Sequence, residues 1–157
     1  MIEGVEIKKL RIIPDKRGFL MEILRSDDPL FQKFGQVYLT SAKYGVAKAW
    51  HYHKFQDDYF VCLLGKILVV LYDQRKNSST YREVNEFEMS DPKFKDSYLL
   101  KIPKGVVHGF TPLEPPEARL LNIPTELYNY QKPDEYRYPW NSSEVPYNWP
   151  DFVKKGG

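Results

Sequence analysis

The sequence predicts an all-β fold, an antiparallel β-barrel or sandwich, and three observations support this. Short apolar runs rich in β-branched and aromatic residues recur along the chain at spacings of about 8–12 residues, bounded by turn residues. Several runs alternate apolar and polar positions, as half-buried strands do. No stretch of about 12 residues or more holds a helical period.

The expected strands are residues 5–13, 19–24, 36–42, 48–53, 59–64, 66–72, 83–89, 97–102, 109–112 and 118–123. One short helix is expected at residues 27–34, where Asp27 can cap the first turn and Pro29 can occupy it. From Pro124 onward the chain is rich in Pro, Tyr and Trp. We expect an ordered, extended C-terminal arm there, because exposed aromatic rings would be costly in water.

Length and composition indicate one domain spanning residues 1–157. The formal net charge is +2 and the basic residues are dispersed, which argues against nucleic acid or an anionic membrane as a partner. The N-terminus lacks the apolar segment of a signal peptide, and no apolar run approaches the roughly 20 residues of a membrane span. The single Cys62 lies in an apolar strand and is expected to be buried and inert. These features predict a cytoplasmic location.

All three histidines lie in motifs that can bring them together. Strand alternation places His51 and His53 on one face, and a turn at residues 54–57 can return Asp58 to that face. His108 follows from a distant strand. Three imidazoles and one carboxylate suit either a metal site or a proton-transfer site.

Two of these motifs resemble the signature of the cupin barrels. The first has Gly45, the His51/His53 pair, an acid at Asp58 and a closing Gly65. The second is the run at residues 103–108, with proline, glycine and histidine in the cupin order. The resemblance implies a jelly-roll antiparallel barrel, but one fold hosts many chemistries.

A narrower resemblance covers nearly the whole chain and is to the dTDP-4-dehydrorhamnose 3,5-epimerase family. Five blocks carry it in the family's order: residues 15–22, 48–51, 72–81, 102–110 and 147–150. It implies an isomerase of deoxysugar or surface polysaccharide biosynthesis. Its substrate would be an NDP-4-keto-6-deoxyhexose or a related keto-sugar, and no cofactor would be needed. We also expect a two-fold homodimer, in which the strand at residues 5–13 pairs with or covers a neighbour.

The resemblance also implies roles for particular residues. His51 stands at the catalytic base, and Arg17, Glu22, Gln36, Lys48 and His108 stand at substrate-contact positions. We also expect Asp58 and His108 to act with His51 in the catalytic group, and Tyr59 to contact substrate. A 4-keto group acidifies the C–H bonds at C3 and C5, a neutral imidazole can take such a proton, and cations can stabilise the resulting enolate and the diphosphate.

Three positions depart from the family's pattern. The family's acid is a Tyr thirteen residues after the histidine of the second motif, and that count reaches Leu121. His53 stands where the family has Gln, and Asp58 where it has Lys. A substitute proton donor is expected among the tyrosines, namely Tyr38, Tyr59, Tyr72, Tyr128, Tyr130, Tyr136 and Tyr138.

Two further functions stay open from the sequence. One is a metal-dependent enzyme holding Fe(II), Mn(II), Ni(II) or Zn(II) through His51, His53, Asp58 and His108. The other is a non-catalytic module that binds sugar nucleotides. In the absence of a metal, Asp58 would instead orient an imidazole or raise its pKa.

Overall fold

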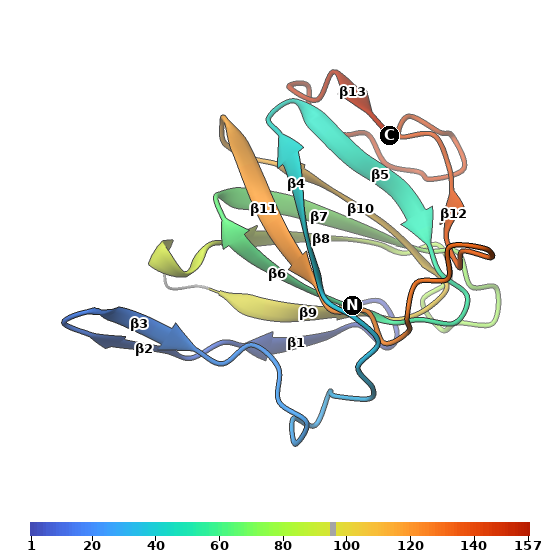
Figure 1. Cartoon of the computed structure of the whole chain (residues 1–157). Helices are drawn as coiled ribbons and strands as arrows, with labels where there is room; N and C mark the ends of the chain where they lie inside the picture. The colour runs from blue at the N-terminus through green and yellow to red at the C-terminus, as the bar shows by residue number, and fades with distance from the viewer. Residues whose placement is uncertain (95–96) are drawn as a thin grey trace.

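The computed structural model describes residues 1–94 and 97–157 and consists almost entirely of antiparallel strands. Two sheets face each other as in a jelly roll (Figure 1). One sheet has the order β1 (Glu6–Lys9), β9 (Tyr98–Ile102), β6 (Asp58–Leu64), β11 (Glu117–Asn122) and β4 (Tyr38–Lys43). The other has the order β12 (Tyr136–Arg137), β5 (Val46–Tyr52), β10 (Val106–Pro112), β7 (Lys66–Asp73) and β8 (Val84–Ser90). The short β13 (Lys155–Gly156) joins this second sheet by pairing parallel with β5.

The N-terminal segment differs from its expected form. The single strand expected at residues 5–13 is divided: β1 pairs with β9, whereas β2 (Ile12–Asp15) pairs with β3 (Gly18–Met21) in a separate hairpin. This hairpin extends away from both sheets (Figure 1). Leu10, which lies between β1 and β2, is buried, whereas the hairpin that follows projects from the sheets.

The helix expected at residues 27–34 is wrong, because this segment forms turns. The Asp28 carboxylate accepts from the backbone N of Arg25 at 2.7 Å and pairs with Lys8 at 2.5 Å. One turn closes where Phe31 N donates to Asp28 O at 2.9 Å. A second turn does not follow, since the segment is tied to β1 and a short helix is costly to nucleate. The helical element among the described residues is η1 (Pro92–Phe94).

Apolar side chains gather in three layers. The interior cluster lies between the sheets and includes Phe60, Val69 and Phe110. A second cluster packs the segment before β4 on the outer face of the β6 sheet. A third covers the outer face of the β5 sheet with the C-terminal arm, where the rings of Trp50 and Trp149 stack 4.7 Å apart. The expected ordered arm therefore secures the strand that carries His51.

Cys62 faces the interior and is 1% exposed, and burial raises the pKa of its thiol to about 12. Across residues 1–94 and 97–157, no helix has the length and apolar character needed to cross a membrane.

Candidate functional site

The three histidines and Asp58 meet between the two sheets. The ring nitrogens of His51, His53 and His108 that could bind a ligand all lie within 4.8 Å of one another. The rings of His51 and His108 are 4.1 Å apart, measured between centroids. Asp58 reaches them from the opposite sheet: its Oδ2 lies 3.2 Å from Nε2 of His53 and 3.3 Å from Nε2 of His108. The sequence motifs thus converge as expected.

Backbone contacts fix the two histidine motifs against each other. His51 and His108 are direct partners in the β5–β10 pairing. Gly105 N donates to His53 O at 2.7 Å. In the turn just before β10, Gly105 has a φ of +83°, which suits glycine. The loop before β6 is also tied in, since Lys104 N donates to Asp57 Oδ1 at 2.9 Å.

A shift of register in β5 brings a cation to the same face. His108 pairs with His51, but Phe110 pairs with Lys48, so β5 has one residue more than β10 in this stretch. Such a bulge interrupts alternation. As a result Lys48 and His51, three residues apart, line the same cavity. Lys48 Nζ donates to Thr40 Oγ1 at 2.8 Å across the barrel.

Asp58 is the buried anion of the site, with 1% of its surface exposed. Its Oδ1 accepts from Gln56 Nε2 and from Asn122 Nδ2, each at 3.0 Å. Burial alone would raise the pKa of Asp58, but the imidazoles of His108 and His53 hold it well below its usual range. Asp58 therefore remains a carboxylate.

The pKa values of His51 and His53 shift in opposite directions. Burial opposes protonation of His53, but Asp58 and the carbonyl of Asp134 overcome it and raise the pKa of His53. Burial, together with the neighbouring His108 and His53, lowers the pKa of His51 well below its usual value. His51 is thus the neutral imidazole of the group, which is the form that can accept a proton.

Two adjoining cavities open beside His51, with volumes of about 210 Å³ and about 450 Å³. Tyr38 and Glu135 line both cavities together with His51. The smaller one is completed by Thr40, Lys48, Phe60, Phe110, Leu120, Arg137 and Gly157. The larger one is completed by Gln36, His53, Gln56, Tyr128 and Tyr130. Of the residues expected to bind substrate, Lys48 lines the smaller cavity and Gln36 the larger one.

The other expected substrate-binding residues lie elsewhere. Arg17 is at the tip of the projecting hairpin, paired with Asp15 at 2.6 Å, and Glu22 follows the hairpin and pairs with Arg25 at 2.9 Å. Tyr59 alternates to the outer face of β6, where its hydroxyl donates to Leu30 O at 2.8 Å. The structure corrects the placement of Tyr59, because strand alternation turns it away from the neighbouring Asp58.

Leu121 also faces away from the cavity. It packs in the outer cluster of the β6 sheet, whereas Leu120 lines the smaller cavity and Asn122 reaches Asp58. The inward positions at this end of β11 are thus a leucine and an amide. Neither side chain offers an acidic proton to a ligand in the cavity.

Several site residues were missed from the sequence, namely Gln56, Asn122, Glu135 and Arg137. Asn122 could have been found by inward alternation along the strand. Glu135 and Arg137 could not, because they belong to the arm and reach the site only through the two-residue pairing of β12 with β5.

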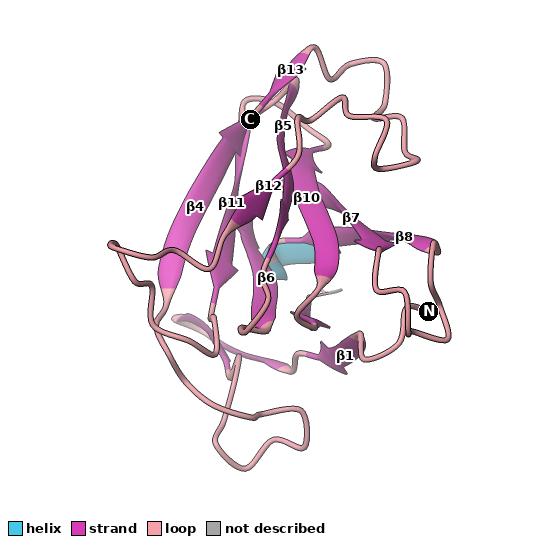
Figure 2. Cartoon of the chain, turned by 90° about the vertical axis from the view of Figure 1, so that its right-hand side faces the viewer, coloured by secondary structure: helices cyan, strands magenta, loops and turns pink. Residues whose placement is uncertain are grey.

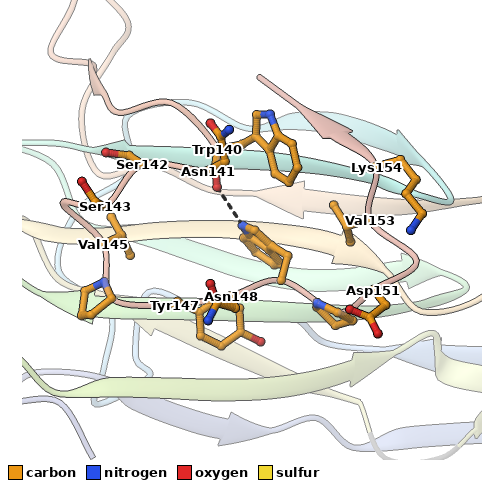
Figure 3. Close-up of a pocket in the computed structure, with 13 residues that line it drawn as sticks. Trp140, Asn141, Ser142, Ser143, Val145, Tyr147, Asn148, Asp151, Val153 and Lys154 are labelled. Carbon is orange, nitrogen blue, oxygen red and sulfur yellow. Dashed lines mark hydrogen bonds between the residues drawn. The ribbon is translucent and has the colours of Figure 1, made fainter.

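A wider cavity of about 980 Å³ is lined by residues of the arm (Figure 3), and none of the three histidines lines it. Its walls come from residues 140–154, and the Nε1 of Trp149 donates to Trp140 O at 3.2 Å behind it. Asp151 and Lys154 are its only charged lining residues. It has none of the imidazoles of the barrel site.

The donor set also fits a divalent transition metal. His53 and His108 each direct Nδ1 at a backbone carbonyl, of Asp134 and Val106 respectively, and Nε2 toward Asp58. Metal-binding histidines are commonly oriented in this way. Nitrogen and carboxylate donors suit Zn(II), Fe(II), Mn(II) or Ni(II).

Comparisons with known proteins agree with the fold and show the family. The family model described as dTDP-4-dehydrorhamnose 3,5-epimerase matches residues 1–155. The chain is 40% identical to the spore coat polysaccharide biosynthesis protein SpsL of Bacillus subtilis, over 95% of this chain and 97% of that protein. It is 37% identical to a probable low-salt glycan biosynthesis epimerase of Haloferax volcanii, over 94% of each. The crystal structure of a dTDP sugar isomerase from Desulfovibrio desulfuricans superposes with a TM-score of 0.88 at 29% identity, covering 97% of this chain and 96% of that one.

Proposed function

Because this chain belongs to the dTDP-4-dehydrorhamnose 3,5-epimerase family, a family of isomerases that act on nucleotide sugars, we propose that it inverts or isomerises a 4-keto-6-deoxyhexose nucleotide with His51 as base. One observation carries this proposal. His51 is a half-buried imidazole with a lowered pKa that lines both cavities, and an ionised Asp58 supports its two neighbours from the opposite sheet.

The surroundings suit proton abstraction next to a ketone. His51 takes the proton from C3 or C5, and the electrons of that C–H bond move onto the keto oxygen. The raised pKa of His53 favours its protonated form, and Lys48 lines the smaller cavity, so both can place positive charge near the developing enolate. The two Tyr rings at the larger cavity, Tyr128 and Tyr130, offer apolar faces for a sugar or a base.

The test uses proton NMR in deuterated water with nucleotide-linked 4-keto-6-deoxyglucose. The wild-type protein should introduce deuterium at C3, C5 or both. His51→Asn should abolish that exchange and leave nucleotide binding nearly unchanged, because the base acts mainly in the transition state. Binding is followed by thermal shift with dTDP-, UDP-, GDP- and CDP-sugars, since a ligand of the folded state raises the melting temperature. Undiminished exchange by His51→Asn would contradict the assignment of the base.

The second candidate is metal-dependent chemistry at the same four side chains. The observation that favours it is the convergence of His51, His53 and His108 within 4.8 Å. Elemental analysis of protein purified without chelator distinguishes the two. Near-stoichiometric metal that is lost in His53→Asn would favour the metal-dependent enzyme. Full exchange activity after chelation would favour the metal-free epimerase.

The proposal includes a homodimer working in the cytoplasm. Arg17 and Glu22 lie on or beside the projecting hairpin and line neither cavity beside His51, which supports a role for them at the site of a neighbouring molecule. The hairpin also exposes the apolar side chains of Ile13, Phe19 and Leu20. Covering them with a second copy would remove apolar surface from water.

A further inference from the structure

We propose that Tyr38 is the proton donor of this site and delivers its proton to the face of the sugar opposite His51. The assignment rests on the proposed epimerase function and adds the residue that completes it. An epimerase must return a proton from the side opposite its base, and β11 offers only Leu120 and Asn122 to the interior at this end.

Tyr38 and His51 belong to opposite sheets and line the same two cavities. β4, which begins at Tyr38, edges the β6 sheet, whereas His51 lies on β5 of the other sheet. Figure 2 shows β4 and β11 on one side of the barrel and β5 and β10 on the other. A sugar ring held between them would present one face to each residue.

The hydroxyl of Tyr38 is held in place by the network that orders the histidines. Its oxygen accepts from Asn122 Nδ2 at 2.8 Å, and the same nitrogen lies 3.0 Å from Asp58 Oδ1. A phenol whose oxygen accepts from an amide keeps its own proton free to donate. Although 41% of the Tyr38 surface is exposed, the hydroxyl lies against Asn122, which is 1% exposed. Burial and the charge of Asp58 raise the pKa of Tyr38 to about 12, so the proton stays in place at neutral pH.

Other candidate donors fit less well. Tyr59 and Tyr72 lie on the outer faces of their sheets. Tyr130 is 89% exposed at the rim and packs against Tyr128. The carboxyl group of Glu135 is engaged by the guanidinium of Arg137.

The step balances without a cofactor. His51 removes the proton from the carbon beside the ketone, and the electron pair moves to the keto oxygen. The enolate then collapses, and its carbon takes the hydroxyl proton of Tyr38 on the other face. The tyrosinate, stabilised by the Asn122 N–H, regains a proton from solvent while His51 releases one.

The experiment follows deuterium and configuration together. In deuterated water the wild-type protein should give deuterated sugar of inverted configuration. Tyr38→Phe should lower the rate of inversion by about 10²–10⁴-fold, the usual worth of a general acid. It should still introduce deuterium with retained configuration, because deuterated His51 can return a deuteron to the face from which it took the proton. A merely structural role would lower both processes together.

Tyr72→Phe is the matched control, since it removes a phenolic hydroxyl from the outer face of β7 and should leave inversion unchanged. Inversion by Tyr38→Phe within about threefold of wild type, or equal loss of inversion and exchange, would overturn the assignment of Tyr38 alone. Absence of deuterium uptake by the wild-type protein would overturn the epimerase function and the donor together.

Discussion

His53 and His108 each present both ring nitrogens to oxygen atoms. In each ring Nδ1 contacts a backbone carbonyl, and Nε2 lies 3.2 or 3.3 Å from the Asp58 carboxylate. At His53, burial is outweighed by the Asp58 carboxylate and the carbonyl of Asp134, which raise the pKa. At His51, burial and the neighbouring His108 and His53 lower the pKa well below its usual value.

The opposite shifts of two histidines predict a maximum in stability near pH 6.5, the ordinary pKa of histidine. The raised pKa of His53 gives stability that is complete below about pH 6.5 and lost as pH rises through its folded value. The lowered pKa of His51 gives stability that is complete above about pH 6.5 and lost as pH falls. Urea denaturation between pH 5 and pH 9 measures both sides.

Single variants separate the two contributions. His53→Gln should reduce the decline in unfolding free energy on the alkaline side, and His51→Asn should reduce it on the acid side. A wild-type profile that rises steadily from pH 6 to pH 9 would contradict the charge assigned to His53. For activity, the neutral state of His51 predicts that kcat/KM keeps its plateau to pH values well below 6.5.

At the scale of elements, β5 and β10 approach each other unusually closely at Gly109. A Cβ at this position would stand 2.4 Å from the Cβ of Ala49 and 2.9 Å from the carbonyl oxygen of Lys48. This is the stretch in which β5 bulges and turns Lys48 and His51 to the same cavity. The absence of a side chain at Gly109 is what allows the bulge to pack.

Gly109→Ala should therefore destabilise the protein by about 1–3 kcal/mol, as overpacked sites do, and should lower activity by displacing His51 relative to His108. Thermal unfolding and the deuterium-exchange rate measure the two effects. Gly157→Ala is the stability control, because its added Cβ meets no heavy atom within 4 Å. Equal melting temperatures for the two variants would contradict the packing explanation.

At the scale of the whole molecule, the hairpin of β2 and β3 forms a separate two-stranded sheet that no other strand of the described residues pairs with. Phe19 and Leu20 are 56% and 57% exposed there, next to the cation of Arg17. The cavity beside His51 receives neither Arg17 nor Glu22 from its own chain. We propose that both observations reflect a two-fold dimer, in which each hairpin covers the partner's barrel.

The double variant Phe19→Asp/Leu20→Asp should shift the protein from dimer to monomer in light scattering at micromolar concentration. It should also weaken nucleotide-sugar binding, because Arg17 and Glu22 would no longer reach a neighbouring site. Tyr81→Asp, a similarly exposed aromatic in the β7–β8 loop, should leave the dimer intact. A monomeric wild-type protein with full activity would rule out this arrangement.

The sequence alone determined the all-β fold, the convergence of the two histidine motifs and the family, because these follow from local periodicity and from the motifs. Strand alternation and one short turn were enough to predict that His51, His53 and Asp58 share one face. The projecting hairpin and the missing helix at residues 27–34 were not predictable in this way. They depend on the pairing of Lys8 with Asp28 and on where the chain leaves the sheet.

Only the tertiary structure decided which residues complete the site. Alternation counted back from His51 would turn Lys48 outward, and the bulge reverses this. Glu135 and Arg137 arrive with the arm, and Tyr38 faces His51 because β4 and β5 belong to opposite sheets. Local sequence sets the direction of a side chain within its own strand. The distance between side chains on different strands depends on register and sheet packing, which are properties of the whole fold.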